Sequence, residues 1–380
     1  MLLKSNTLLV VVVLFLFASF TACKKYDEVS GEHKTDTLLP FVLNGKVGYM
    51  NTSGDIEIMP RYDVASAFSE GLARVFIDQK YGYINKSGSI VIKPVFDGAG
   101  DFRDGIALVV IDGNRGYIDK KGNMITGQHL DNTWGFSEGL ASVNVSGKYG
   151  FINRDGDMVI KPQFDVASNF SEGLALVVKD GKRGFINKKG IYVINPSFNS
   201  ASGFSEGLAR VRIGSENGFI DKQGNVKIQP AYDEALDFKE GVARVRVGRK
   251  YGFINKEGKM VIEAVYKKAW SFSDGLARVS VNGEVGFINK EGKFAIKPKY
   301  DGASNFSEGL AFVSINGKVG YINRRGKMVI KPKYEGASKF KDGFARVYIQ
   351  HQMGYINTKG DYIWNPTDAG LATKLCTPPF

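Results

Sequence analysis

The sequence predicts an all-β protein built from ten tandem repeats. A glycine followed by Tyr or Phe, then Ile or Met, then Asn or Asp recurs ten times at one constant interval, at Gly48, Gly82, Gly116, Gly150, Gly184, Gly218, Gly252, Gly286, Gly320 and Gly354. Between these glycines, apolar β-branched residues alternate with polar ones, which is typical of strands with one buried face. Gly is 46 of 380 residues and Pro only 11, a composition typical of many tight turns.

Residues 71–104 illustrate the strands that each repeat predicts. Ala73, Val75 and Ile77 alternate with Arg74 and Phe76, which indicates a strand with one buried face. The segment 78–80 then forms a hairpin turn, and residues 81–85 form a second strand. The repeat therefore starts with an antiparallel hairpin.

The second half of the repeat predicts one more strand and a connector. Residues 85–88 form a turn in which Gly88 adopts a positive φ without steric cost. A third strand covers residues 89–93 and is ended by Pro94, because proline cannot donate to a strand ladder. The following connector carries Phe102, whose equivalents recur in nine copies, from Phe68 to Phe340. Each unit is thus a three-stranded antiparallel meander.

Such a unit buries too little apolar area to be stable alone, so the ten units at residues 37–376 must stack on one another. The sequence favours an open β-solenoid or superhelix. The array begins with a first strand (Leu39, Phe41) and ends with a third strand (Tyr362–Trp364), and a repeat as short as 71–104 is small for the usual four-stranded propeller blade. A closed or spiral propeller-like ring is the alternative, and residues 377–380 form a C-terminal tail.

The N-terminus predicts export. The apolar run Thr7–Phe20 is too short to cross a hydrocarbon core of about 30 Å but suits a signal peptide. The end of this run, Phe20-Thr21-Ala22-Cys23, resembles the bacterial lipobox, which implies cleavage of a 1–22 signal peptide and lipidation of Cys23. Residues 23–36 then form a flexible polar tether.

The residues that follow Cys23 indicate which membrane carries the protein. Lys24 and Lys25 follow Cys23 where some bacteria place an inner-membrane Asp signal, so the resemblance favours a lipid-anchored location at the outer membrane of the cell envelope. Whether the protein faces the periplasm or the cell surface stays open.

The repeated residues resemble the WG-repeat (KWG-repeat) family. Copies such as Lys80-Tyr81-Gly82-Tyr83-Ile84-Asn85 and Phe306-Ser307-Glu308-Gly309-Leu310-Ala311 carry the likeness, which covers residues 37 to about 366. The Trp that usually precedes the glycine is absent from all ten copies. The resemblance implies a bacterial, often exported protein and brings no general catalytic residues.

Basic residues form a column, meaning residues at equivalent positions of successive repeats. The net charge is +12, which favours anionic partners. Eight of the basic residues follow the second strand at equivalent positions: Lys86, Lys120, Arg154, Lys188, Lys222, Lys256, Lys290 and Arg324. We interpret this basic column as a candidate contact for anionic glycan or lipid, or as a solvated turn. Nucleic acid is not expected as a partner of an exported protein.

Acidic residues form two further columns. Asp or Glu precedes a glycine nine times, from Glu70 to Asp342, and caps that turn or stays solvated; a ladder that chelates cations or binds a basic partner is the alternative. An Asp such as Asp97 follows the strand-three aromatic in six copies and is predicted to bond to the connector backbone.

The chain carries no constellation that predicts catalysis, a metal site or a cofactor. Its three histidines, His33, His129 and His351, share no column. The sequence favours a lipid-anchored, monomeric, non-catalytic envelope scaffold that binds an unknown protein or glycan. Its specificity would come from the variable position before each repeat glycine (Val47 to Met353) and from Arg74, Arg210, Arg244, Arg278 and Arg346.

The alternative function is an envelope hydrolase acting on glycan. Its active site would lie in the aberrant third and seventh units, which depart from the repeat around His129, Asp131, Trp134 and Trp270.

Overall fold

A computed structural model describes residues 37–126, 132–133 and 135–367. The prediction of an all-β chain is confirmed: the described residues form 38 strands, and Thr37–Pro366 make one compact unit. Within this part of the chain, no helix is long and apolar enough to span a membrane. The predicted signal peptide, Cys23, the tether and the tail at 377–380 lie outside the described residues.

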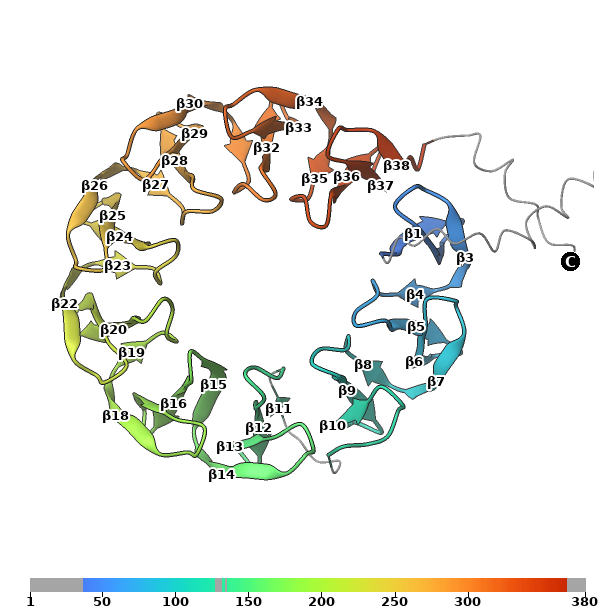
Figure 1. The fold of residues 1–380 in the computed structure, drawn as a ribbon, viewed down its shortest axis with the longest axis horizontal. Helices are drawn as coiled ribbons and strands as arrows, with labels where there is room; N and C mark the ends of the chain where they lie inside the picture. Colours follow the sequence, from blue (N-terminus) through green and yellow to red (C-terminus); the bar gives the residue numbers. More distant parts are fainter. Residues whose placement is uncertain (1–36, 127–131, 134, 368–380) are drawn as a thin grey trace, which may run out of the picture. The chain divides into compact units, whose positions relative to one another are not determined.

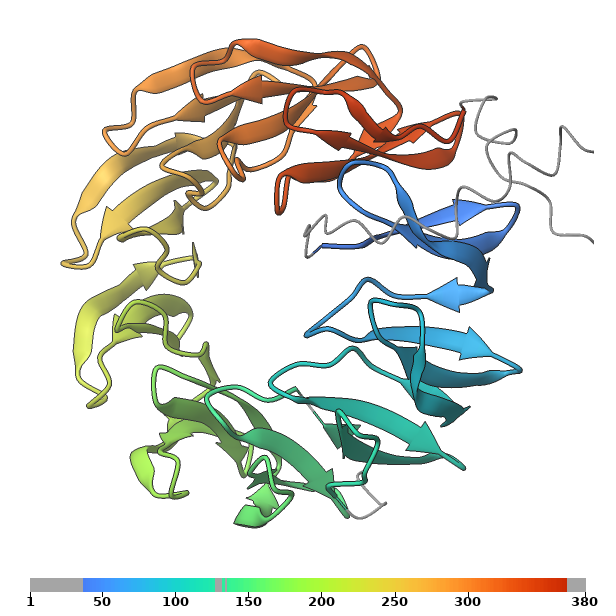
Figure 2. The same cartoon turned by 45° about the vertical axis from the view of Figure 1, so that its right-hand side comes forward.

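The strands form ten small sheets, or blades, arranged as a ring around a central opening (Figure 1). Blade 2 is representative, with its strands in the order β4-β5-β6-β7 and every neighbouring pair antiparallel. The two-residue strand β4 lies innermost and β7 runs along the outer rim, as the turned view also shows (Figure 2). This arrangement is a ten-bladed β-propeller.

The strands fall into four groups by their place in the blade. The innermost strands are β4 (Val64–Ala65), β8 (Gly98–Ala99), β11 (Asn132–Thr133), β15 (Val166–Ser171), β19 (Ser200–Ala201), β23 (Glu234–Ala235), β27 (Lys268–Ala269), β31 (Gly302–Ala303) and β35 (Gly336–Ala337). The first long strands are β1 (Leu39–Leu43), β5 (Ala73–Ile77), β9 (Ile106–Ile111), β12 (Ala141–Val145), β16 (Leu174–Lys179), β20 (Ala209–Ile213), β24 (Val242–Val247), β28 (Ala277–Val281), β32 (Leu310–Ile315) and β36 (Phe344–Ile349).

The other two groups complete each blade. The second long strands are β2 (Lys46–Met50), β6 (Lys80–Ile84), β10 (Asn114–Asp119), β13 (Lys148–Ile152), β17 (Lys182–Ile186), β21 (Glu216–Ile220), β25 (Lys250–Asn255), β29 (Glu284–Ile288), β33 (Lys318–Asn323) and β37 (Gln352–Asn357). The outer strands are β3 (Ile56–Tyr62), β7 (Ile90–Phe96), β14 (Met158–Phe164), β18 (Tyr192–Phe198), β22 (Val226–Tyr232), β26 (Met260–Tyr266), β30 (Phe294–Tyr300), β34 (Met328–Tyr334) and β38 (Tyr362–Trp364).

The three-stranded unit expected from the sequence lacks one strand of the blade that the structure shows. The segment predicted as a connector contains the innermost strand of the next blade, so β8, at the end of the second repeat, pairs with β9 of blade 3. Among the described residues only blade 1 lacks an innermost strand and only blade 3 lacks an outer one. Each of the first nine repeats therefore contributes to two successive blades.

The open solenoid favoured from the sequence is wrong, because the first and last blades meet. Phe41 of β1 and Trp364 of β38 stack with their ring centroids 4.4 Å apart. A side chain built on Gly54, in the β2–β3 turn, would collide with the Ile363 carbonyl. The same turn packs on the preceding outer strand elsewhere, for example Gly88 on Ile58. The contact between the last and first blades therefore has the same geometry as the contacts between consecutive blades.

The hydrophobic core lies between blades. Ile58 and Tyr62 of one outer strand pack with Ala73 and Val75 of the next blade's first long strand in a single buried cluster. The recurrent connector Phe stacks on the aromatic residue of the second long strand in the preceding blade, as Phe102 does on Tyr83 at 4.8 Å. Blade-to-blade packing therefore supplies the burial that one blade lacks.

The expectation that Pro94 ends the third strand is also wrong, since β7 runs through it to Phe96. The register shifts between Tyr81 and Tyr83, so β7 bulges over Gly82. A Cβ on Gly82 would lie 2.7 Å from both the Ile92 carbonyl oxygen and the Pro94 nitrogen. An outer strand tolerates the missing proline donor, and the bulge explains why the repeat requires this glycine.

Candidate functional site

The acidic column occupies tight loops between the innermost strand and the first long strand, which point into the ring centre (Figure 1). Ser69 and Leu72 exchange backbone hydrogen bonds around Glu70 and Gly71. Both central residues have positive φ, 51° for Glu70 and 88° for Gly71, as in a type I′ turn. A non-glycine residue in this conformation costs about 1 kcal/mol, and the contacts of its side chain offset that cost.

Eight of these nine carboxylates, from Glu70 to Glu308, bind the next blade. Glu70 accepts backbone hydrogen bonds from Asp104 at 2.5 Å and Gly105 at 2.8 Å, both in blade 3. Lys120, in the β10 turn of blade 3, lies 3.2 Å from the same carboxylate. The equivalent ion pairs are Arg154–Asp104, Lys188–Glu138, Lys222–Glu172, Lys256–Glu206, Lys290–Glu240 and Arg324–Asp274.

These contacts set the ionisation of the acidic column. Partial burial alone would raise the pKa of Glu70, but the Gly105 backbone hydrogen bond and Lys120 outweigh it and hold the pKa below its usual value. The pKa values of Glu138 and Glu206 are lowered in the same way, by Gly173 with Lys188 and by Gly241 with Lys256, against partial burial. The charged carboxylates stabilise the blade-to-blade contact.

Seven of the eight residues of the predicted basic column therefore hold neighbouring blades together. Each of the seven lies within 4 Å of a carboxylate of the preceding blade. An anionic ligand at this column would have to compete with those carboxylates. Nor does the acidic column only cap its own turn, as the sequence suggested, since it binds the turn of the next blade.

The second acidic column joins blades at the hairpins between the first and second long strands. Asp97, at the end of β7, accepts a hydrogen bond from the backbone of Asp112 in the next hairpin at 2.7 Å. It also pairs with Lys80, and both partners hold its pKa below the usual value. The predicted bond to the connector backbone is wrong, because the carboxylate reaches past the connector to the hairpin of the next blade.

Arginines of the first long strand reach the next blade as well. Arg74, Arg244 and Arg278 donate to the backbone carbonyls of Ala99, Ala269 and Ala303 in the following innermost strand. Three of the five arginines expected to provide specificity are therefore used between blades.

Near the hairpins, blades 2–10 each carry a set of three residues that changes from repeat to repeat. We call this set the variable triplet: three residues that lie opposite one another on the innermost, first long and second long strands. The triplets are Val64/Phe76/Tyr81, Gly98/Val110/Arg115, Asn132/Asn144/Tyr149, Val166/Val178/Arg183, Ser200/Arg212/Asn217, Glu234/Arg246/Tyr251, Lys268/Ser280/Val285, Gly302/Ser314/Val319 and Gly336/Tyr348/Met353.

The adjacent level of the sheet is nearly constant by contrast. Ala65, Val75 and Gly82 lie opposite one another there, and Val and Gly hold these strand positions in every following copy. Several triplet side chains are exposed, among them Val64 at 44%, Val166 at 49% and Tyr348 at 41%. The residues that change between repeats therefore lie one position along each strand from the residues that stay constant.

The position before the repeat glycine, the third member of the triplet, is only partly exposed. Val47, Asn217, Val285 and Val319 are buried there, which corrects the expectation of an exposed column. Asn217 donates to the carbonyls of Tyr232 and Asp233 at 3.1 and 3.0 Å, because this position lies opposite the aromatic that ends the outer strand.

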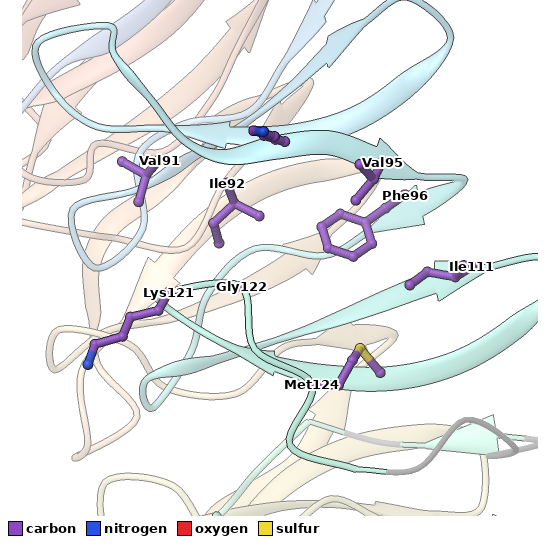
Figure 3. A pocket seen from close by; sticks show the side chains of 9 residues that line it. Val91, Ile92, Val95, Phe96, Ile111, Lys121, Gly122 and Met124 are labelled. Carbon is purple, nitrogen blue, oxygen red and sulfur yellow. The ribbon is translucent and has the colours of Figure 1, made fainter.

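The aberrant third blade leaves a hollow of about 350 Å³ on its outer side (Figure 3). Val91, Val95 and Phe96 of β7 face Met124 and Lys121 across it. Of the residues suggested for a hydrolase, His129, Asp131 and Trp134 lie outside the described residues. Trp270 lies under the Arg278 guanidinium of the same blade, which is 4.4 Å from the ring centroid and donates to the Ala303 carbonyl of the next blade.

The described residues hold no group of three or more His, Cys, Asp or Glu side chains placed to bind a metal ion. His351, at a hairpin tip, lies beside Glu335, which accepts its backbone N–H at 2.9 Å.

Sequence comparison identifies the repeat. The pattern described as the WG containing repeat matches nine consecutive segments, at residues 48–81, 81–114, 116–149, 149–182, 184–216, 218–251, 251–284, 286–318 and 320–349. The chain belongs to the WG-repeat family. No curated protein sequence matches this WG-repeat protein.

Solved structures show likeness of fold to the WG-repeat ring. A eukaryotic initiation factor is 11% identical with a TM-score of 0.51, covering 77% of this chain and 95% of the other. The extracellular domain of the putative one component system BT4673 from B. thetaiotaomicron is 10% identical with a TM-score of 0.30, covering 86% of this chain. PorZ of the type-IX secretion system of Porphyromonas gingivalis is 9% identical with a TM-score of 0.28, covering 87%. The WG-repeat chain spans 58% and 57% of these last two.

Proposed function

We propose that this WG-repeat protein is a non-catalytic scaffold of the cell envelope, anchored by a lipid on Cys23, whose ring binds a protein or glycan partner. The variable triplets carry the proposal. The repeated polar columns are occupied by contacts between blades, whereas the triplets differ in every copy. Repeat proteins acquire specificity where surface residues vary over a fixed core.

The chemistry of the triplets favours a protein partner. Blade 2 presents Phe76 and Tyr81 with ring centroids 4.8 Å apart. In blade 7, Arg246 lies 3.0 Å from the Glu234 carboxylate, to which the Tyr251 hydroxyl donates at 3.0 Å. Aromatic residues and arginine are enriched in protein–protein interfaces. Anionic glycan at the basic column is the other proposed contact, and there it must displace the acidic column.

Capture of a partner by triplet-dependent binding tests the proposal. The lipidated chain, purified in detergent, is compared with variants carrying Val64→Lys, Val166→Lys or Tyr348→Lys. Matched controls are Ile90→Lys, Val261→Lys and Val329→Lys on the outer strands, whose residues are 53%, 38% and 39% exposed. Loss of a captured envelope component in the triplet variants but not in the controls supports the proposal. Equal retention in both sets contradicts it.

The anchor and the anionic contact need separate measurements. Cys23→Ser should release the protein from the membrane fraction, and a protein that stays attached would contradict lipid anchoring. A captured acidic glycan that is released by about 500 mM salt, where screening is strong, and by Lys188→Ala would instead assign binding to the basic column.

A further inference from the structure

The outer strands of blades 8 and 9 concentrate positive charge on one arc of the ring's outer edge. We call residues 293–299 and 327–333, which begin one residue before β30 and β34, the basic rim. These residues include six lysines and no Asp or Glu, whereas the equivalent segment of any other outer strand carries at most one lysine. All six lysines are exposed: Lys293, Lys297, Lys299, Lys327, Lys331 and Lys333.

The ammonium groups of the basic rim are not neutralised within the described part of the chain. Lysines of the basic column lie against carboxylates, as Lys290 does 3.8 Å from Glu240. The six lysine side chains of the basic rim form no ion pair and no hydrogen bond with any residue that the structure describes. Lys333 instead lies 5.1 and 5.0 Å from the ring centroids of Tyr334 and Tyr362. The charge of these lysines therefore remains available to an anionic partner.

The acidic residues that adjoin the basic rim leave this charge in place. Asp301 and Glu335 follow β30 and β34, and each accepts a backbone hydrogen bond from the hairpin of the next blade, at 2.7 and 2.9 Å. Glu291 lies in the turn before β30, and Arg325 holds the equivalent position in the turn before β34. The arc formed by the two strands is therefore positively charged.

Exposed apolar side chains lie among these lysines. Phe294 of β30 is 44% exposed, Val329 of β34 is 39% exposed, and Tyr362 at the start of β38 is 40% exposed. Strands β30, β34 and β38 follow one another along the outer edge of the ring (Figure 1). The contact of Lys333 with the Tyr362 ring joins blades 9 and 10 there. One arc of the ring thus combines apolar side chains with cations.

This combination favours a lipid surface over other anionic partners. At a bilayer interface, aromatic and aliphatic side chains enter the boundary between headgroups and acyl chains, while basic side chains contact anionic headgroups. An acidic polysaccharide would use the lysines but would leave Phe294 and Val329 in water.

We propose that the basic rim docks on an anionic phospholipid bilayer. The lysine ammonium groups contact lipid phosphates, and Phe294 and Val329 enter the interface. Because the contact lies on the outer edge, the ring stands on edge on the membrane. This contact uses none of the variable triplets and does not require the lipid on Cys23, so it holds whether or not the proposed partner binding and anchoring are correct.

Sedimentation with lipid vesicles tests the charge requirement. The chain without residues 1–23 is used, so that neither the signal peptide nor a lipid on Cys23 reaches the bilayer; it retains the compact unit Thr37–Pro366. The vesicles contain equal parts of phosphatidylcholine and phosphatidylglycerol. The test variant is Lys297→Gln with Lys331→Gln. The matched control is Lys93→Gln with Lys161→Gln, which removes the same charge at the same strand position in blades 2 and 4.

The test variant should bind the vesicles at least about tenfold more weakly than the unmodified chain, because each lysine near an anionic surface contributes to the attraction. The control should change binding by less than about twofold. Equal losses in the two variants, or no sedimentation of the unmodified chain, would overturn the proposal. Binding to soluble polygalacturonate without binding to vesicles would assign the basic rim to an acidic glycan and would also overturn it.

A fluorescent label tests which arc of the ring meets the bilayer. An environment-sensitive dye is attached at Val329→Cys or at Val159→Cys in the same chain with Cys376→Ser. Val159 is the equivalent residue of β14, is 44% exposed, and lies on the opposite side of the ring, where β14 is drawn (Figure 1). Vesicles should shift the emission of the dye to the blue at Val329→Cys and leave it unchanged at Val159→Cys. Equal shifts at both positions, or no shift at Val329→Cys, would show that the basic rim is not the membrane contact.

Discussion

Phe41 and Trp364 join the first and last blades of the ring, with their ring centroids 4.4 Å apart and their planes inclined by 49°. At the equivalent positions of the other blade interfaces the pair is usually Val and Ile, such as Val75 with Ile58 or Val245 with Ile228. Larger side chains thus fill the one interface that is not formed by consecutive blades.

This aromatic pair should contribute strongly to stability. Trp364 is 3% exposed and Phe41 is fully buried, so Trp364→Ala should lower the free energy of unfolding by about 3–5 kcal/mol. A double-mutant cycle with Phe41→Ala should give a coupling energy of about 1 kcal/mol, measured by denaturant unfolding. Additive effects of the two substitutions would show that the rings do not interact.

The repeat glycine should not tolerate a methyl group. A Cβ on Gly218 would lie 2.5 Å from the Ile228 carbonyl oxygen, so Gly218→Ala forces the bulge of β22 to move. We expect a loss on the order of 3 kcal/mol in thermal unfolding. The control is Gly203→Ala, where a Cβ meets nothing within 4 Å. Equal melting temperatures for the two variants would contradict the bulge.

Acid should weaken the contacts between blades. The folded-state pKa values of Glu70, Glu138 and Glu206 lie below the usual value of 4.5. The folded chain therefore binds fewer protons at these carboxylates than the unfolded chain does. Their stabilisation is present above about pH 4.5 and is lost as the pH falls through the lower folded-state pKa.

Replacing two of these carboxylates should show the same dependence. Glu138→Gln with Glu206→Gln should lower the melting temperature at pH 7 and have a much smaller effect near pH 3. Glu291→Gln serves as the control, because this exposed turn residue contacts no described partner. A variant that loses equal stability at both pH values would show that charge is not the cause.

A single basic-column residue should contribute little to stability. Lys188 lies 3.2 Å from the Glu138 carboxylate and donates to the Glu138 carbonyl at 2.9 Å. Because these groups are partly exposed, Lys188→Ala should cost at most about 1 kcal/mol, less at high salt. Lys189→Ala, next to it in the same turn, should cost nothing measurable. A larger, salt-independent effect of Lys188→Ala would contradict an ion pair at the surface.

The sequence was sufficient to predict the repeat and its three long strands, because alternation over five or more residues marks a strand. It did not reveal the two-residue innermost strand, since Gly98–Ala99 is too short to alternate. That missing strand made the unit look too short for a propeller blade. The expectation that Pro94 ends the third strand was wrong because an outer strand tolerates a proline, whereas a strand paired on both sides needs the backbone N–H that proline lacks.

The columns were visible in the sequence but their partners were not. Glu70 and Lys120 belong to different repeats, and only the angle between blades brings them together. The variable triplet could have been found by asking which strand positions change between copies, since Phe76 and Tyr81 lie between fixed Val and Gly columns.

Electron microscopy of the purified chain tests ring closure most directly. We expect class averages of a closed ring of ten blades around a central opening, with blade 1 against blade 10. An open arc or a superhelix, with the first and last blades apart, would contradict the stacking of Phe41 on Trp364 and the closed scaffold built on it.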